Sequence, residues 1–344
     1  MEVGIQRLRV RSDMRGCAGA AAVLAVALLC GAPRPTAAQE FSDVFFFGDS
    51  LTDTGIFCTG LIFSEQGYAS GRCSNGDLWA DVLAEALGVN LDSLEENFAK
   101  GGDTTSDLDD QITAFEISLF FQDADPDALY VVWLGSNDVL AMPTSPMAMQ
   151  SAVNRVVNGI ERLADLGAEH FLVPNLVDVG RAWGHFDFDF PNVKGAIFTP
   201  EERARVTELS SEFNALLGPA LATLSGVTVH PLDVHAVLED IFATPASFGF
   251  SPDVIDSTSD ATDFGIPCLE VPACESDPQG AIADGFILFD ALHPTTAAHR
   301  LIGARAVRLV PEPAAVLGQA LALLLTAALA FGSGTVSRSG RHSP

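Results

Sequence analysis

The sequence predicts an α/β protein built on a parallel β-sheet with helices on both faces. Short apolar runs, which are typical of buried strands, alternate along the chain with longer segments of helical spacing. A chain that alternates in this way sets its strands parallel and covers both faces of the sheet with the connecting helices. The chain has 344 residues, which is enough for one large domain with a substantial core.

The strands are expected at the apolar runs, because a strand that is buried on both faces has a nearly continuous apolar sequence. The first run contains three consecutive phenylalanines and ends at Gly48, and the longest run reads ALYVVWL. A shorter run before Lys100 supplies a fifth strand. In chain order, the expected strands are 44–47, 96–99, 128–134, 170–173 and 227–232.

The segments between these runs have apolar residues at helical spacing, so they are expected to form the connecting helices. Pro294 and Thr295 are expected to open a final helix. The stretch 243–285 differs, since it is rich in Asp, Ser, Pro and Gly. We expect a long excursion near the site there, with a closing lid as one form it can take. The expected helices are 78–87, 108–121, 148–166 and 201–224.

Small or polar residues follow the first three strands. Ser50 comes after the first strand, Gly102 after the second and Asn137 after the third. The carboxyl ends of parallel strands meet at one edge of the sheet, which is where ligands bind in such folds. The sequence therefore predicts that these three residues converge on one site.

Ser50 is the candidate nucleophile, with Asp290 and His293 as its candidate acid and base. A serine is a poor nucleophile until a base removes its proton, and that base needs a third group to hold its tautomer. A spacing of three residues puts Asp290 and His293 on one face of a turn. The carboxylate can then accept a hydrogen bond from Nδ1 while Nε2 faces Ser50.

A tetrahedral intermediate also needs donors directed at its oxyanion. Gly102 offers a backbone amide with no side chain in the way, and Asn137 offers a side-chain amide. The backbone amide of Ser50 is the third expected donor.

These blocks resemble the GDSL, or SGNH, hydrolase family, whose hallmarks are Ser, Gly, Asn and His in that order. Ser50, Gly102, Asn137 and His293 fall on those positions, and Asp290 falls on the family's acid. The similarity also includes the blocks Ser-Asn-Gly at 74–76 and Val-Pro-Asn-Leu at 173–176, and it covers nearly all of residues 41–309.

The resemblance implies a three-layer α/β/α sandwich with flavodoxin-like strand order and a central five-stranded parallel sheet. It also implies ester hydrolysis through an acyl-enzyme, with no metal and no organic cofactor. The expected substrate is a small-molecule or lipid ester, and phospholipase or acyltransferase activity and polysaccharide O-deacetylation are alternatives. A rival from another class is a catalytically silent surface or matrix protein that keeps the fold and binds a partner.

Both ends of the chain carry signals for export. Four arginines precede an apolar run that ends before Thr36-Ala37-Ala38, which predicts a signal peptide over residues 1–38 that signal peptidase removes. The hydrolase domain is then expected over residues 39–309.

The other end, residues 310–344, has a Pro-Glu-Pro motif, an apolar stretch of roughly 18 residues and a basic tail. It resembles the PEP-CTERM sorting signal of Gram-negative bacteria, which implies recognition by an exosortase. The alternative is a plain C-terminal membrane anchor. Either interpretation gives an exported protein, secreted or associated with the cell surface, whose C-terminal helix anchors it to the membrane transiently or permanently.

The composition agrees with export and excludes some partners. A formal net charge of −27 opposes binding to nucleic acid. Two of the six cysteines lie in the predicted signal peptide, and an even number in an exported domain favours disulfides. Four cysteines allow three pairings; the local one joins Cys58 to Cys73 and Cys268 to Cys274, and free thiols are the alternative.

Other polar and aromatic residues have two interpretations each. Asp233 and His235 form a second acid–base pair in the sequence, but their neighbours favour a packed helix start. His299 is expected to be structural, and Asp49, Asp53, Asp103 and Asp138 to shape turns by hydrogen bonding. The acidic run 253–263 fits a calcium site or a solvated loop. The residues that could line an acyl pocket, or simply pack, are Phe57, Leu61, Ile62, Phe63, Phe248 and Phe250.

Overall fold

The computed structural model describes residues 41–89, 91, 96–182, 199–251 and 267–310. The predicted signal peptide, nearly all of the predicted sorting segment and the acidic run 253–263 lie outside the described residues. Within the described part of the chain, no helix is both long enough and apolar enough to span a bilayer.

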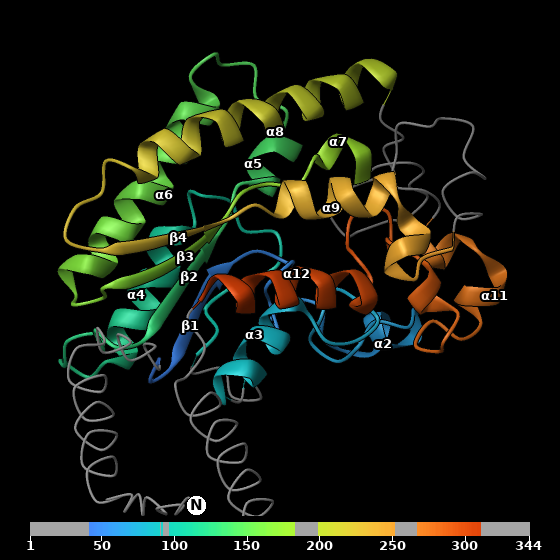
Figure 1. Ribbon diagram of the computed structural model, residues 1–344, viewed down its shortest axis with the longest axis horizontal. Helices are drawn as coiled ribbons and strands as arrows, with labels where there is room; N and C mark the ends of the chain where they lie inside the picture. Colours follow the sequence, from blue (N-terminus) through green and yellow to red (C-terminus); the bar gives the residue numbers. More distant parts are fainter. Residues whose placement is uncertain (1–40, 90, 92–95, 183–198, 252–266, 311–344) are drawn as a thin grey trace, which may run out of the picture. The chain divides into compact units, whose positions relative to one another are not determined.

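The sheet is parallel and has four strands in the described residues, not the predicted five. Figure 1 shows β1 (Val44–Gly48), β2 (Leu129–Trp133), β3 (His170–Pro174) and β4 (Thr228–Leu232) side by side in that order. Each strand lies within a residue or two of the predicted run. For β1, β2 and β3 the buried apolar sequence is itself the strand, whereas β4 lies at the edge of the sheet and only its Leu232 is buried, so the prediction of a buried strand there was wrong.

The fifth segment lies on the other edge of β1 and makes one parallel bridge, between Phe46 and Asn97. The Lys100 amide still donates to the Gly48 carbonyl at 3.1 Å, but the ladder ends there because the Gly48 amide, the next donor of β1, donates to Gln111 Oε1 at 3.0 Å. Even so, the segment follows β1 in the chain and lies beside it, opposite β2. The order of the five segments is therefore the flavodoxin-like order that the resemblance implies.

Helices cover both faces of the sheet, as the sequence predicts. Phe46 packs edge-on against Trp79 of α3 (Trp79–Leu87), whereas Phe45 and Phe47 pack against Phe115 of α4 (Leu108–Ser118). Successive strand residues point to opposite faces, so α3 and α4 lie on opposite sides of β1.

The remaining long helices join one of these two layers. The α3 layer includes α12 (Thr296–Leu309), which also contacts α9 (Val234–Ala243). The α4 layer includes α6 (Ala148–Asp165), which contacts α8 (Pro200–Leu221). Figure 1 shows α12 beside α3 in front of the strands, with α6 and α8 together on the other side of the molecule.

Several short elements complete the fold, and the predicted excursion contains only short helical turns among its described residues. Helices of three to five residues are too short for a periodic sequence pattern, so none of them was predicted. They are α2 (Leu61–Glu65), α5 (Ser136–Leu140), α7 (Val179–Ala182), α11 (Pro272–Glu275), η1 (Pro245–Phe248), η2 (Cys268–Glu270) and η3 (Ala283–Gly285).

The predicted helix 108–121 ends early, at Ser118. Phe120 and Phe121 have φ values of 49° and 69°, a left-handed conformation that a right-handed helix cannot include. Their side chains are 80% and 106% exposed, so the apolar spacing continues past the point where the helix leaves the core. The sequence pattern alone does not distinguish these exposed rings from buried ones.

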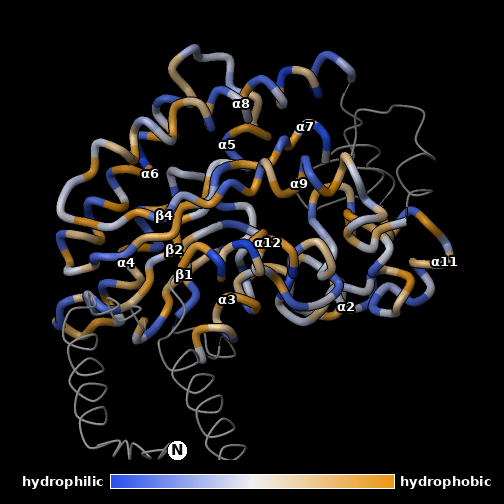
Figure 2. Tube along the Cα trace, in the orientation of Figure 1, coloured by the Kyte–Doolittle hydropathy of each residue, from blue (hydrophilic) through white to orange (hydrophobic). Residues whose placement is uncertain are grey.

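Two clusters of buried side chains hold the domain together. The larger one surrounds the sheet, and Figure 2 shows hydrophobic stretches on both the strands and the helices. The smaller one contains Tyr68, Phe286, Phe289 and four cysteines. Those cysteines form the disulfides Cys58–Cys73 and Cys268–Cys274, which is the local pairing that the sequence favours.

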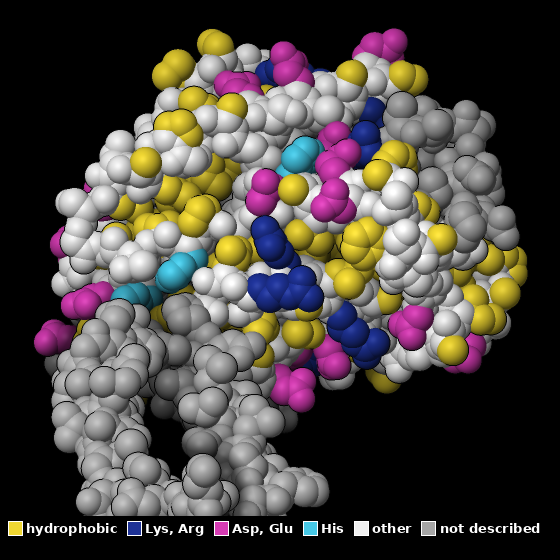
Figure 3. All heavy atoms as spheres, in the orientation of Figure 1, with side chains coloured by type: hydrophobic (Ala, Val, Ile, Leu, Met, Phe, Trp, Pro, Cys, Tyr) yellow, Lys and Arg dark blue, Asp and Glu magenta, His cyan; other side chains and the backbone are white. Residues whose placement is uncertain are grey.

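Charge is distributed unevenly on this acidic chain. Figure 3 shows Lys and Arg side chains gathered over α12. This helix exposes Arg300, Arg305 and Arg308, and the last of these lies at the carboxyl end, where the helix dipole favours a cation.

Candidate active site

Ser50 lies on a tight turn at the carboxyl end of β1. The Asp49 carbonyl accepts hydrogen bonds from the amides of Thr52 (3.0 Å) and Asp53 (2.9 Å), which reverses the chain directly after the strand. A side chain at Gly48 would come within 2.9 Å of Thr52 and 3.1 Å of the Trp133 carbonyl. The turn therefore requires glycine before it and presents Ser50 at the edge of the sheet, 8% exposed.

The structure brings Ser50, His293 and Asp290 into one chain of hydrogen bonds. The His293 Nε2 atom lies 2.9 Å from Ser50 Oγ, and Nδ1 lies 2.7 Å from Asp290 Oδ2. All three side chains are buried, with His293 3% exposed and Asp290 6% exposed. The imidazole thus bridges hydroxyl and carboxylate with one nitrogen each, as general-base activation of a serine requires.

The turn that carries His293 is fixed by the Ser-Asn-Gly block at 74–76. Ser74 Oγ donates to the Pro294 carbonyl at 2.8 Å, and the Thr296 amide donates to Asn75 Oδ1 at 2.8 Å. A side chain at Gly76 would meet Thr296 Oγ1 at 2.6 Å. The sequence singled out this block as part of the resemblance but assigned it no role; in the structure it holds the start of α12.

Of the expected oxyanion donors, Ser50 and Asn137 line the same pocket, whereas Gly102 does not. Asn137 Nδ2 donates one hydrogen to the Asp103 carbonyl at 2.8 Å, which holds the amide against the residue next to Gly102. The nitrogen of an asparagine side chain carries two hydrogens, so one of them remains for a ligand. Within the described residues, the backbone amides of Ser50 and Gly102 have no hydrogen-bond acceptor.

Four aspartates shape the loops around the site, as expected. Asp53 accepts four backbone amides, from Gly55, Ile56, Phe57 and Gly101, and so ties the Ser50 turn to the glycine loop. The other three aspartates also accept hydrogen bonds from neighbouring loops and helices: Asp49 from the Leu51 amide, Asp103 from Gln111 Nε2, and Asp138 from the amide and hydroxyl of Thr105.

Sequence reasoning missed three supporting side chains. Gln111, in the middle of α4, bonds both the amide and the carbonyl of Gly48 and also reaches Asp103. Arg155 pairs with Asp138 at 3.0 Å and bonds Thr105 at 2.9 Å. Tyr68 donates to Asp290 Oδ2 at 2.6 Å. No local sequence feature indicates the roles of Gln111 and Arg155. Tyr68 could have been considered, because it lies in the loop that the predicted Cys58–Cys73 disulfide closes.

An apolar pocket opens beside Ser50. Its free space is about 20 Å³, close to the volume of one water molecule. Of the six residues proposed for an acyl pocket, the five whose side chains the structure describes do not line it: Phe57 and Phe63 pack in the smaller cluster, Phe250 in the larger one, and Leu61 and Phe248 are exposed. The side chain of Ile62 lies outside the described structure. The apolar lining residues are instead Leu51, Trp133, Leu140, Val177, Val179, Leu238, Leu288, Leu292, Pro294 and Ile302.

The competing Asp233–His235 pair caps a helix. Asp233 is the N-cap of α9, and its Oδ1 accepts from the Ala236 amide (3.0 Å) and from Asn175 Nδ2 (2.8 Å). The His235 amide donates to Asn175 Oδ1, so the pair is the packed helix start that its neighbours indicate. His299 lies fully buried in α12, where burial lowers its pKa to about 3.

Asp49 differs from the other aspartates because its carboxyl group is buried next to Ser50. Burial raises its pKa to about 7, and the hydrogen bond from the Leu51 amide and the proximity of His293 only partly oppose that shift. The unfolded chain releases this proton near pH 4, so the folded state binds it more tightly between about pH 4 and 7. The contribution of Asp49 to stability is therefore greatest below that window and is lost as the pH rises through it.

We expect Asp49→Asn to become more stable relative to wild type as the pH rises from 4 to 8. The difference in unfolding free energy should grow by about 2–4 kcal/mol over this range, because the buried amide never ionises. Urea unfolding of both proteins at pH 4, 6 and 8 measures this difference. Asp127→Asn, at an exposed position, is the control for loss of a charge. A difference that stays constant with pH would contradict the shifted ionisation of Asp49.

Among the described residues, no group of three or more His, Cys, Asp or Glu side chains is arranged to hold a metal ion. The site itself consists of a hydroxyl, an imidazole, a carboxylate and amide donors beside an apolar pocket.

Comparison with known proteins shows the family of the chain. The sequence model of the family described as GDSL-like Lipase/Acylhydrolase matches residues 44–306. The chain is 24% identical to the thermolabile hemolysin of Vibrio parahaemolyticus over 77% of its own length and 62% of that protein. It is 27% identical to Esterase EstA of Pseudomonas aeruginosa, over 84% of this chain and 49% of that protein.

A third relative is the phosphatidylcholine-sterol acyltransferase of Aeromonas hydrophila, 31% identical over 41% of this chain and 46% of that protein. The chain thus spans between 46% and 62% of the length of these three relatives. The family match extends from β1 to α12 and contains every residue of the site described above. The chain belongs to the GDSL-like lipase/acylhydrolase family.

Proposed function

We propose that this protein is an exported carboxylic ester hydrolase that acts through an acyl-enzyme on Ser50. The observation that carries the proposal is the hydrogen-bonded chain from Ser50 through His293 to Asp290 at the mouth of an apolar pocket. That arrangement has the nucleophile, base and orienting acid that acyl transfer to serine needs.

In the proposed reaction, Ser50 Oγ attacks the ester carbonyl carbon while its proton passes to His293 Nε2. The carbonyl oxygen becomes an oxyanion, for which the amides of Ser50, Gly102 and Asn137 are the proposed donors. As the bond to the leaving alcohol breaks, His293 protonates the alcohol oxygen. Water then attacks the acyl-enzyme with the same base, releases the acid and restores Ser50.

The narrow pocket favours a short acyl group, since its free space is about 20 Å³. We expect p-nitrophenyl acetate and butyrate to be hydrolysed faster than the octanoate and palmitate, with a fluorophosphonate adduct on Ser50 in the mass spectrum. A maximum at palmitate would overturn the short-chain preference. Absence of both hydrolysis and label would overturn the enzyme proposal in favour of a silent surface-binding protein, because only an activated serine reacts appreciably.

Acyl transfer is the second candidate, since one relative is named as an acyltransferase. The same residues perform it when an alcohol replaces water in the second step. Reaction of p-nitrophenyl butyrate in the presence of methanol separates the two activities: a transferase yields mainly methyl butyrate, and a hydrolase mainly butyric acid.

Export is supported by both disulfides, which persist in oxidising compartments. We propose removal of residues 1–38 by signal peptidase, and an exosortase or a membrane anchor for the segment 310–344. The intact mass of the protein recovered from the native cell envelope tests both ends; a mass that includes the first 38 residues would contradict signal-peptide cleavage.

A further inference from the structure

Asp290 has a second partner besides His293. Its Oδ2 atom accepts from His293 Nδ1 at 2.7 Å and from the Tyr68 hydroxyl at 2.6 Å. Its Oδ1 atom accepts from the amides of Leu292 (2.8 Å) and His293 (2.7 Å). Four donors therefore fix the carboxylate in one orientation, and Tyr68 is the only one that comes from outside residues 290–293.

These donors decide the charge of the carboxylate. Burial alone would raise the pKa of Asp290, but the proximity of His293 and the hydrogen bonds from His293 and Tyr68 hold it below its ordinary value of 3.8. Burial and the charge of Asp290 raise the pKa of Tyr68, so the phenol keeps its proton and stays a donor.

The surroundings of Tyr68 hold its ring in place. The residue lies in the loop that the Cys58–Cys73 disulfide closes, and its side chain is 2% exposed. Its ring packs edge-on against Phe289, the neighbour of Asp290, with centroids 4.9 Å apart, and against Phe63 at 5.5 Å. A buried tyrosine hydroxyl needs a partner, and here the partner is the carboxylate of the site.

We propose that Tyr68 is a positioning residue that fixes Asp290 so that one lone pair of Oδ2 stays aligned with His293 Nδ1. This rests on the proposed function of Ser50, His293 and Asp290. Without the phenol, the carboxylate keeps three donors but loses the donor that shares Oδ2 with the imidazole and helps to hold this oxygen in place. The imidazole is then held less well in the orientation that takes the proton from Ser50.

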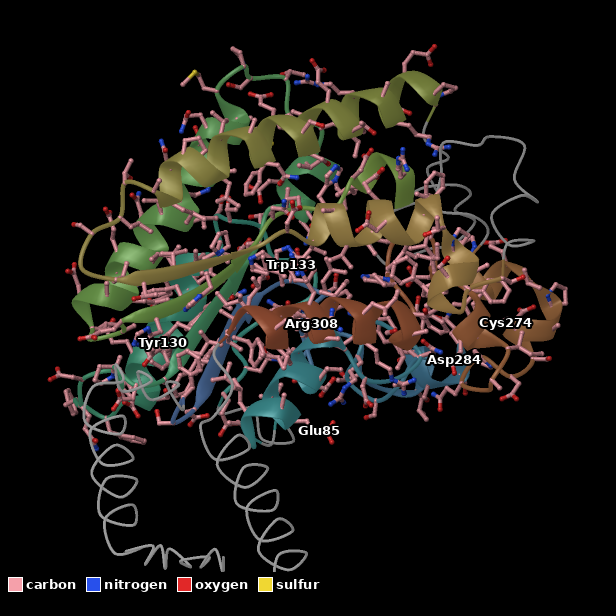
Figure 4. All side chains as sticks on the ribbon, in the orientation of Figure 1. Glu85, Tyr130, Trp133, Cys274, Asp284 and Arg308 are labelled. Carbon is pink, nitrogen blue, oxygen red and sulfur yellow. A yellow bond between two sulfur atoms is a disulfide. The ribbon has the colours of Figure 1, made fainter. Side chains whose placement is uncertain are left out.

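The chain offers a matched control for removing this hydroxyl, because it contains only two tyrosines. Tyr130 is also fully buried, and its hydroxyl donates to the Asp125 carbonyl at 2.9 Å. Figure 4 shows Tyr130 on the sheet far from the Cys274 disulfide and toward the opposite end of β2 from Trp133, which lines the pocket.

We expect Tyr68→Phe to lower kcat about tenfold, the effect of losing one hydrogen bond to a charged group, while KM changes less than about twofold. Tyr130→Phe should leave kcat within about twofold of wild type. In an Asp290→Ala background, Tyr68→Phe should have no further effect on kcat, because the group it positions is absent. An unchanged kcat, or an equal decrease in that background, would overturn the proposal.

A second measurement keeps the native hydroxyl. Biosynthetic 3-fluorotyrosine in the Tyr130→Phe background places a single fluorine at residue 68. Its ¹⁹F resonance should move on Asp290→Ala and stay in place on His235→Ala; a resonance that ignores Asp290 would refute the contact. If wild type neither hydrolyses esters nor reacts with fluorophosphonate, the proposed function fails, and this resonance still decides the contact by itself.

Discussion

Ser50→Ala is expected to lower kcat for ester hydrolysis by about 10⁵- to 10⁶-fold, to a level near the background rate. The methyl group cannot attack the carbonyl, and no other hydroxyl is hydrogen-bonded to His293 in the described structure. Fold and stability should change little, because within the described residues the Ser50 side chain makes one hydrogen bond, with His293, and the turn is held by backbone hydrogen bonds to Asp49. Initial rates with p-nitrophenyl butyrate measure the effect, and fluorophosphonate labelling should disappear with it.

His293→Ala is expected to lower kcat about as much as Ser50→Ala does, and the double variant should be no slower than either single variant. Nucleophile and base act as one unit, so their losses do not add. His235→Ala is the control, because His235 lies at the start of α9 and its amide bonds Asn175. Losses that multiply in the double variant, or an equal loss in His235→Ala, would contradict the proposed roles.

Much of the fold follows from the sequence because burial on both faces leaves a simple pattern. The strand 128–134 could be predicted since every residue of β2 is buried, which requires a continuous apolar run. The segment at Asn97 could not be resolved in the same way. There the ladder ends because the Gly48 amide bonds Gln111, which lies 63 positions away in the sequence, and a contact of this kind leaves no local pattern.

In the site, too, residues in local sequence motifs could be predicted, and residues that reach the site from distant positions could not. Ser50, Asn137 and His293 could be named because each follows a strand or opens a helix within a recognisable block. Tyr68 could not, since it lies 222 residues from Asp290 in sequence and in a loop without periodicity. Gln111 lies in the middle of α4, where a polar residue on a buried face resembles any other helix residue, although it contacts Gly48 from 63 positions away.

Asn137→Ala is expected to lower kcat about 10²- to 10³-fold, with KM nearly unchanged. The amide can stabilise charge only where charge develops, so its loss affects the transition state more than substrate binding. The hydrogen bond to the Asp103 carbonyl uses one hydrogen of the Asn137 amide and fixes the orientation of the group. The second hydrogen is thereby held in a fixed direction. A fall in kcat/KM that comes entirely from KM would contradict this role.

Asn214→Ala is the matched control, because the Asn214 side chain also bonds the backbone but does so away from Asp103. Its Oδ1 accepts from the Leu176 amide at 2.8 Å, and its Nδ2 donates to the Leu176 carbonyl at 2.7 Å. It should lower stability by about 1–3 kcal/mol, the cost of leaving partly buried backbone groups unpaired, while kcat changes little. Thermal unfolding and kcat measured on both variants separate the two effects. If Asn137→Ala lowers only stability, as Asn214→Ala is expected to, then Asn137 holds the loop at Asp103 and the oxyanion depends on the backbone amides of Ser50 and Gly102 alone.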